Sequence, residues 1–86
     1  MDTYHVYILQ SQKHHRFYAG MTADLENRLN AHNLGLNKST RNGTPWIRIW
    51  TNGPLSKIEA LALERKIKKR GIQRFLEDLD FFRPHF

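Results

Sequence analysis

Residues 4–21 read YHVYILQSQKHHRFYAGM, and this stretch decides the fold. Two runs within it, Tyr4–Gln10 and Arg16–Met21, are rich in the β-branched and aromatic residues that are typical of strands. The polar link between the two runs, residues 11–15, is short. Because a parallel pair needs a crossover of about a dozen residues or more, the short link predicts an antiparallel hairpin.

Side chains along a strand alternate between its two faces. On the first strand, one face carries Tyr4, Val6 and Ile8, and the other carries His5, Tyr7 and Leu9. On the second strand, Tyr18 shares a face with Gly20, which has no side chain and either opens space or lets backbone approach a ligand. Tyr7 and Tyr18 are either an ordinary aromatic core pair or two phenols that line one pocket and contact a phosphate and its water.

The next part of the chain predicts a helix and a third strand. Thr22 or Asp24 caps a helix that runs to about His32 or Asn33, and Gly35 is its stop. Residues 36–45 form a polar loop, WIRIWT at 46–51 is a strand, and residues 52–54 form a turn.

The longest helix begins with a capping box, in which the side chains of Ser56 and Glu59 bond each other's backbone amides. It runs to about Arg70 and ends at Gly71, and Gln73–Asp78 forms a short final helix. The order β-β-α-β-α-α predicts an α+β fold with a small three-stranded antiparallel sheet flanked by helices. From 86 residues we expect a single domain over residues 1–86. Its motif-bearing core is at about 4–78, and an aromatic tail at 79–86 docks on the core or on a partner.

The charge of the chain favours a polyanionic partner. It has 14 Lys plus Arg against 8 Asp plus Glu, a net charge of +6, and a pI near 10.1. The alternative is that a small protein is basic for solubility alone. The lack of cysteine excludes a disulfide scaffold, a Cys-ligated zinc site and a thiol nucleophile. Residues 1–10 show neither a signal peptide nor a membrane span, so we expect a cytoplasmic protein that does not bind membranes.

Two polar residues of the first helix lie at the edge of its apolar face. Arg28 and His32 fall about 60° and 20° to one side of Leu25, which with Leu29 marks the buried stripe. They are either an arginine whose stem covers apolar surface and a hydrogen-bonded core histidine, or groups that carry function.

Glu64 lies at a similar border on the longest helix, about 60° from the centre of the stripe formed by Ala60, Leu63 and Ile67. It either pairs with Lys68, four residues later, or ligates a hard cation such as Mg²⁺ at the rim of a groove.

Basic residues gather in two places that suit a phosphate backbone. Lys38 and Arg41 lie in the polar loop, while Arg65, Lys68 and Lys69 belong to a basic run near the end of the longest helix. The alternative for the helical run is a solvated face whose charges complement the helix dipole.

Together these features resemble the GIY-YIG endonuclease family. His5-Val6-Tyr7 stands where the family has its first motif and Tyr18-Ala19-Gly20 where it has the second, with His5 and Ala19 departing from the pattern. Residues 24–33, DLENRLNAHN, resemble the arginine helix, and residues 59–64, EALALE, resemble the glutamate helix. The ending RGIQRFL at 70–76 resembles small stand-alone members, which are similar to the nuclease domain of the bacterial excision-repair incision subunit.

The resemblance implies a metal-dependent endonuclease that hydrolyses DNA phosphodiester bonds, in repair or recombination. Glu64 would hold one Mg²⁺ or Mn²⁺, and Arg28 would contact the phosphate oxygens. Tyr7 would activate the water, His32 would take or relay its proton, and Tyr18 would orient phosphate or water. DNA is the implied partner, and a second protein would supply targeting.

Two other functions stay open. A nucleic-acid-binding module could use the same fold with weak or lost catalysis, and it would bind nucleic acid without metal-dependent cutting. A protein-interaction adaptor could use the aromatic tail, and its binding would be insensitive to salt and to phosphate competitors.

Overall fold

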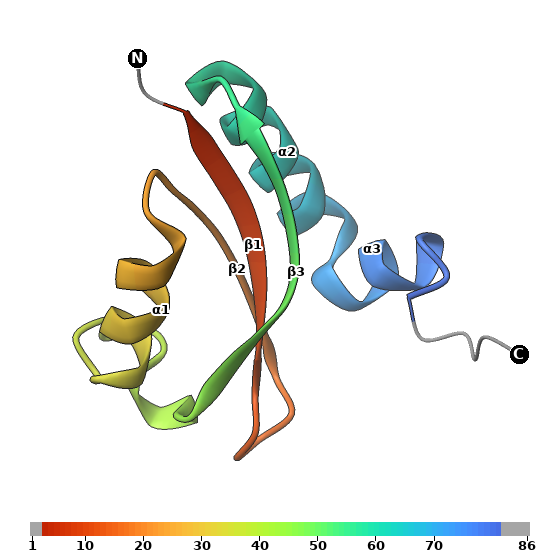
Figure 1. Cartoon of the computed structure of the whole chain (residues 1–86). Helices are drawn as coiled ribbons and strands as arrows, with labels where there is room; N and C mark the ends of the chain where they lie inside the picture. The colour runs from red at the N-terminus through yellow and green to blue at the C-terminus, as the bar shows by residue number, and fades with distance from the viewer. Residues whose placement is uncertain (1–2, 82–86) are drawn as a thin grey trace, which may run out of the picture.

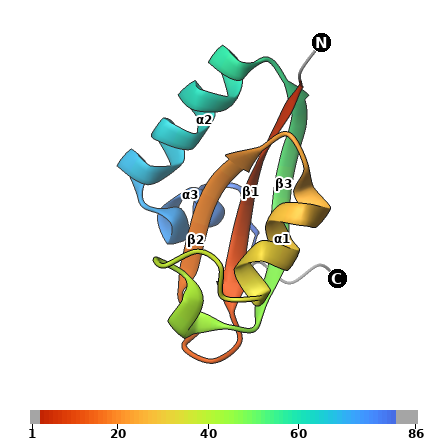
Figure 2. The same cartoon turned by 90° about the vertical axis from the view of Figure 1, so that its left-hand side faces the viewer.

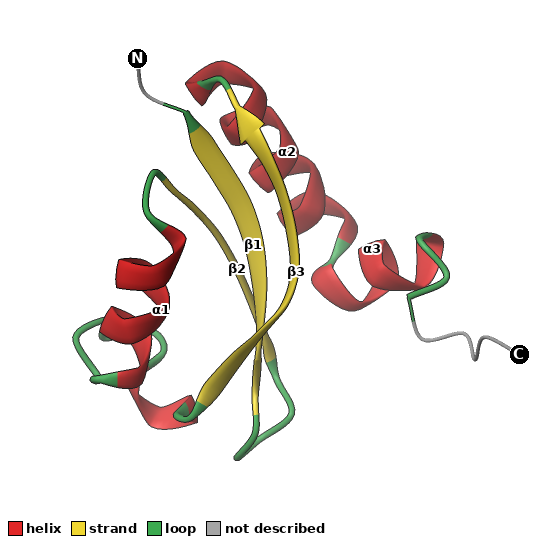
Figure 3. Ribbon diagram, in the orientation of Figure 1, coloured by secondary structure: helices red, strands yellow, loops and turns green. Residues whose placement is uncertain are grey.

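The computed structural model describes residues 3–81, and its elements follow the predicted order β-β-α-β-α-α (Figures 1 and 3). The strands are β1 (Tyr4–Ser11), β2 (Phe17–Thr22) and β3 (Trp46–Leu55), and the helices are α1 (Leu25–Asn33), α2 (Lys57–Arg70) and α3 (Ile72–Asp78). Within the described residues, no helix is long and apolar enough to cross a membrane.

The sheet is the middle layer of the molecule. Its strand order is β2-β1-β3, and β1 pairs antiparallel with both neighbours, so the predicted α+β fold and hairpin are confirmed. Helix α1 covers one face of the sheet, whereas α2 and α3 lie on the other (Figures 1 and 2). The two faces of β1 therefore meet different helices.

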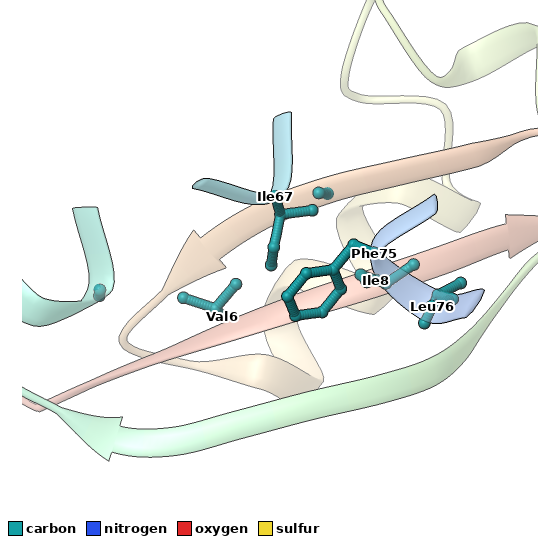
Figure 4. Packing of buried hydrophobic residues seen from close by; sticks show 7 residues of the cluster. Val6, Ile8, Ile67, Phe75 and Leu76 are labelled. Atoms are coloured by element: carbon teal, nitrogen blue, oxygen red, sulfur yellow. The ribbon is translucent and has the colours of Figure 1, made fainter. Parts of the chain in front are cut away.

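Each face of the sheet has its own apolar core, as the alternation along β1 predicts. Val6 and Ile8 pack towards α2 and α3, where Ile67, Phe75 and Leu76 meet them (Figure 4). On the other face, a second cluster contains Tyr7, Leu9 and Trp46, and Tyr18, Leu25 and Leu29 pack against it.

The turn predicted at residues 52–54 is wrong, because β3 continues through it to Leu55, which pairs with Tyr4. The register shifts there: the pairs Tyr4–Leu55 and Val6–Asn52 place three steps of β3 against two steps of β1. This is a β-bulge, and Gly53 lies in it with a φ of 155°, which favours glycine. The turn-like residues thus bend a strand rather than end it.

The predicted helix caps fit the structure. Ser56 Oγ accepts a hydrogen bond from the Glu59 amide at 3.1 Å, and Glu59 Oε1 accepts one from the Ser56 amide at 2.9 Å. The hydrogen bonds from Ser56 lower the pKa of the Glu59 carboxyl. Asp24, not Thr22, caps α1 by accepting the Asn27 amide at 3.2 Å.

The loop after α1 contains a 3₁₀ helix, Arg41–Gly43, that loop composition did not predict. In the tail, the Phe81 amide donates to the Leu76 carbonyl at 3.0 Å. The rest of the predicted docking tail, residues 82–86, lies outside the described residues.

Candidate active site

The hairpin places Tyr7 and Tyr18 on the face that α1 covers. Tyr7 lies directly opposite Gly20 in the β1–β2 register, and its ring occupies the space that a side chain at position 20 would fill. The two tyrosine rings lie 6.4 Å apart between centroids. Gly20 therefore opens space on this face, as expected, and the neighbour that uses the space is Tyr7.

Helix α1 brings His32 into contact with both tyrosines. His32 Nε2 lies 3.0 Å from the Tyr7 hydroxyl oxygen, and the His32 and Tyr18 rings are 5.1 Å apart between centroids. His32 is fully buried and is hydrogen-bonded on both ring nitrogens. It is thus a satisfied core histidine and, at the same time, the direct partner of a tyrosine hydroxyl.

The predicted buried stripe of α1 needs correction. Leu25 and Leu29 are only half-buried, and His32 is the helix residue that is fully covered. The reason is a clamp at the end of the helix, where the Asn33 side chain bonds both the amide and the carbonyl of Trp46 at 2.7 and 3.1 Å. This clamp ties the end of α1 to the start of β3, next to the buried His32.

Electrostatics keep the Tyr7–His32 pair neutral near neutral pH. The pKa of Tyr7 is raised mainly by burial and then by Tyr18 and Glu64, while the Arg28 charge lowers it. Burial and then Arg28 lower the pKa of His32. Arg28 and Glu64 therefore lie close enough for their charges to act on Tyr7, although the two belong to helices on opposite faces of the sheet.

Arg28 is exposed, and within residues 3–81 it forms no ion pair. Its guanidinium is therefore available to a solute. Glu64 has a side chain that is 22% exposed, and its Oε1 lies 3.6 Å from Lys68 Nζ. The ion pair predicted as the alternative for Glu64 is present, but the carboxylate stays partly hydrated.

The basic residues divide between two surfaces. Lys38 and Arg41 are exposed on the loop that follows α1, and Lys68 lies beside Glu64. Arg65 and Lys69 instead line a shallow groove of about 660 Å³ that also contains Phe75 of α3. None of the tyrosine, histidine or glutamate candidates lines this groove, so the structure does not bring Arg65 and Lys69 into the cluster around Tyr7.

Thr40 was missed by the sequence analysis. It is 1% exposed, and its Oγ1 lies 2.7 Å from His32 Nδ1. Its neighbours in the sequence are polar loop residues, which gave no sign of burial. The only available signal was Trp46, a large aromatic residue at the start of a strand, whose indole Nε1 donates to the Thr40 carbonyl at 2.7 Å.

The donor chemistry at Glu64 fits a magnesium-type cation. In the part of the chain that the structure describes, no three His, Cys, Asp or Glu side chains form a metal cage. Mg²⁺ does not need such a cage, because it keeps several waters and takes one or two carboxylates together with substrate phosphate. A partly hydrated single carboxylate is sufficient on these terms.

The family model of the GIY-YIG catalytic domain matches residues 3–74, which include all three strands, α1 and α2. No curated protein and no solved structure matches the chain.

Proposed function

Since this chain belongs to the GIY-YIG family, whose nuclease domains act on DNA, we propose that it is a metal-dependent endonuclease that hydrolyses DNA phosphodiester bonds. The observation that carries the proposal is the 3.0 Å contact between the Tyr7 hydroxyl and His32 Nε2, with Arg28 and Glu64 within electrostatic reach. A hydroxyl, a base, a cation and a carboxylate are the groups that such a hydrolysis needs.

Hydrolysis requires that a water lose a proton as it attacks phosphorus. Burial raises the pKa of Tyr7, so the hydroxyl stays protonated near neutral pH, and it must lose this proton before it can act as a base. Transfer of the phenol proton to His32 Nε2 would leave a phenolate that can take the proton of the water. The positive charge of Arg28 favours the phenolate and opposes the imidazolium.

The other candidates act on the phosphate. Arg28 would donate to the equatorial oxygens with its planar guanidinium, and Tyr18 would orient the phosphate or the water. Glu64 would hold one Mg²⁺ or Mn²⁺. When bound, this cation supplies positive charge that polarises the phosphate and neutralises the leaving oxygen.

The surrounding cations would bind the DNA backbone. Lys38 and Arg41 extend from the loop that carries Thr40, and Lys68 lies next to Glu64. Arg65 and Lys69 would contact DNA only along the α2–α3 groove. A cytoplasmic role in repair or recombination, with targeting by a partner protein, completes the proposal.

The test is a cleavage assay with branched, single-stranded and duplex DNA in the presence of Mg²⁺, Mn²⁺ or EDTA. We expect cutting that requires the cation, that EDTA abolishes and that Tyr7→Phe removes. Binding without cutting in every condition would contradict the proposal. It would instead favour a nucleic-acid-binding module, which is consistent with the ion pair that Lys68 makes to the Glu64 carboxylate.

A further inference from the structure

A buried series of hydrogen bonds continues from Tyr7 and His32 into the loop between α1 and β3. Thr40 Oγ1 lies 2.7 Å from His32 Nδ1 and 3.4 Å from the Asn37 carbonyl oxygen. Thr40 is almost completely buried, so water does not compete for its hydroxyl. The three side chains and the carbonyl therefore form one connected path.

The structure fixes this loop from several sides. Trp46 Nε1 donates to the Thr40 carbonyl at 2.7 Å, and the Asn33 side chain holds the Trp46 backbone. Ser11 Oγ donates to the Gly43 carbonyl at 2.5 Å. The position of the Thr40 hydroxyl is thus set by α1, β1 and β3 together.

The carbonyl at the end of the path is the basis for the direction that we assign to its bonds. A carbonyl oxygen can only accept, so it offers the Thr40 hydroxyl an acceptor at 3.4 Å, and a hydroxyl that donates to Asn37 has only lone pairs left for His32. In this orientation His32 Nδ1 carries the ring proton and donates it to Thr40, which leaves Nε2 bare. The bare Nε2 would then accept the hydrogen bond of the Tyr7 hydroxyl, which lies 3.0 Å away.

We infer that Thr40 is a positioning residue that holds His32 in the Nδ1–H tautomer, so that its bare Nε2 faces the Tyr7 hydroxyl. The catalytic consequence rests on the proposed function. The Tyr7 O–H bond breaks and an N–H bond forms at Nε2, which gives a phenolate and an imidazolium. The phenolate takes a proton from the attacking water, and the imidazolium then passes its Nε2 proton back to the Tyr7 oxygen, which gives up its other proton on the substrate side. Thr40 Oγ1 accepts from Nδ1–H throughout.

The tautomer can be measured without DNA, by the ¹⁵N shifts of the His32 ring near neutral pH. We expect the proton on Nδ1 in the parent protein and in Thr40→Ser, which keeps the hydroxyl. Thr40→Val keeps the volume but removes the hydroxyl, and it should shift His32 towards the Nε2–H form. Thr44→Val is the matched control, because Thr44 Oγ1 also donates to a backbone carbonyl, that of Arg41, without contacting His32.

Cleavage assays test the catalytic consequence. Thr40→Val should lower kcat roughly 10²-fold, the size of a general-base contribution, with little change in KM. Thr40→Ser and Thr44→Val should cut like the parent. The inference would be overturned if His32 of the parent protein carried its proton on Nε2. It would also be overturned if Thr40→Val changed neither the His32 tautomer nor kcat. If the parent cuts no DNA, only the proposed function fails, because the ring spectra of the parent and of Thr40→Ser still decide the tautomer.

Discussion

A Cβ atom at position 20 would lie 2.5 Å from the hydroxyl oxygen of Tyr7 and 2.7 Å from its Cζ atom. Gly20 and Tyr7 are directly opposed in the β1–β2 pairing, so the tyrosine ring crosses the neighbouring strand where that strand has no side chain. The missing side chain lets the hydroxyl reach His32. The glycine is therefore a geometric requirement of the Tyr7–His32 contact.

Gly20→Ala should displace the Tyr7 ring and break its hydrogen bond to His32. Overpacking of this kind costs about 1–3 kcal/mol of stability. We expect cleavage to fall roughly 10²-fold, as for other small displacements of a catalytic group. Denaturant unfolding and cleavage rates measure the two effects. Tyr7→Phe is the reference, because it removes the hydroxyl without adding an atom. A Gly20→Ala protein with the parental cleavage rate would show that the contact is only structural.

Arg28→Lys keeps the positive charge but loses the planar guanidinium, which can donate two hydrogen bonds to one phosphate. Because Arg28 is exposed and makes no ion pair within residues 3–81, stability should not change. We expect a large loss of cleavage with DNA binding largely intact, since the contact matters most in the transition state. Arg74→Lys, an exposed arginine on α3, is the matched control. Equal cleavage by the Arg28→Lys protein and the parent would make Arg28 a surface residue without a catalytic role.

DNA binding should weaken steeply as the salt concentration rises, because Lys and Arg side chains that bind DNA phosphates release the counterions condensed there. Each phosphate contact adds roughly 0.9 to the slope of log affinity against log salt. Replacing Lys38 and Arg41 with Gln should therefore flatten the slope, while Lys57→Gln at the start of α2 should leave it unchanged. Titrations at several salt concentrations measure it. Affinity that does not respond to salt would argue against DNA as the partner.

The features that the sequence predicted well are local. Alternation along β1, the hairpin and the Ser56–Glu59 capping box depend on neighbours within a few residues, and each is present. The opposition of Tyr7 and Gly20 lies in the same hairpin, but the sequence predicted only the hairpin and not the register that pairs these two residues.

The features that the sequence did not predict depend on distant contacts. The bulge at Gly53 exists because Tyr4 pairs with Leu55, some fifty residues away in the chain. Thr40 is buried because an indole from β3 binds its carbonyl, and no property of the polar loop signals that bond. The burial of His32 likewise depends on a distant contact, because the Asn33 side chain bonds the Trp46 backbone and ties α1 to β3.

The buried His32 should make folding sensitive to mild acid. Its folded-state pKa is lowered by burial and by Arg28, whereas in the unfolded chain it titrates near its usual value of about 6.5. As the pH falls below about 6.5, the unfolded state binds a proton that the folded state resists. The contribution of neutral His32 to the stability of the fold is therefore fully present above this pH. It is lost progressively as the pH falls towards the folded-state pKa of His32.

Denaturant unfolding between about pH 7 and pH 5 measures this loss, since paired carboxylates such as Asp78 respond only at lower pH. In His32→Gln the slope of stability against pH should be flatter than in the parent. His14→Gln, at an exposed histidine of the β1–β2 turn, should keep the parental slope. Identical slopes in the parent and His32→Gln would contradict the assignment.

Glu64 separates the catalytic hypothesis from a purely structural one. Its carboxylate is partly hydrated at the border of the α2 stripe and lies 3.6 Å from Lys68. If the ion pair were its only role, Glu64→Gln would cost about 0.3–0.5 kcal/mol and leave cleavage unchanged. If the carboxylate holds the cation, Glu64→Gln should fold normally, bind DNA and fail to cut. Apo protein should also bind Mg²⁺ weakly, because one carboxylate needs substrate phosphate to complete the coordination shell.

Two further variants make the Glu64 experiment decisive. Lys68→Gln breaks the same ion pair from the other side, so it should flatten the salt dependence of binding and still allow metal-dependent cutting. Glu59→Ala removes the other glutamate of the motif, whose carboxylate bonds the Ser56 amide. Its loss should lower the stability of the protein while cleavage of the folded protein persists. Cleavage at the parental rate by Glu64→Gln, or equal effects of Glu64→Gln and Lys68→Gln on cutting, would remove Glu64 from the mechanism, because a metal ligand and its ion-pair partner cannot be interchangeable.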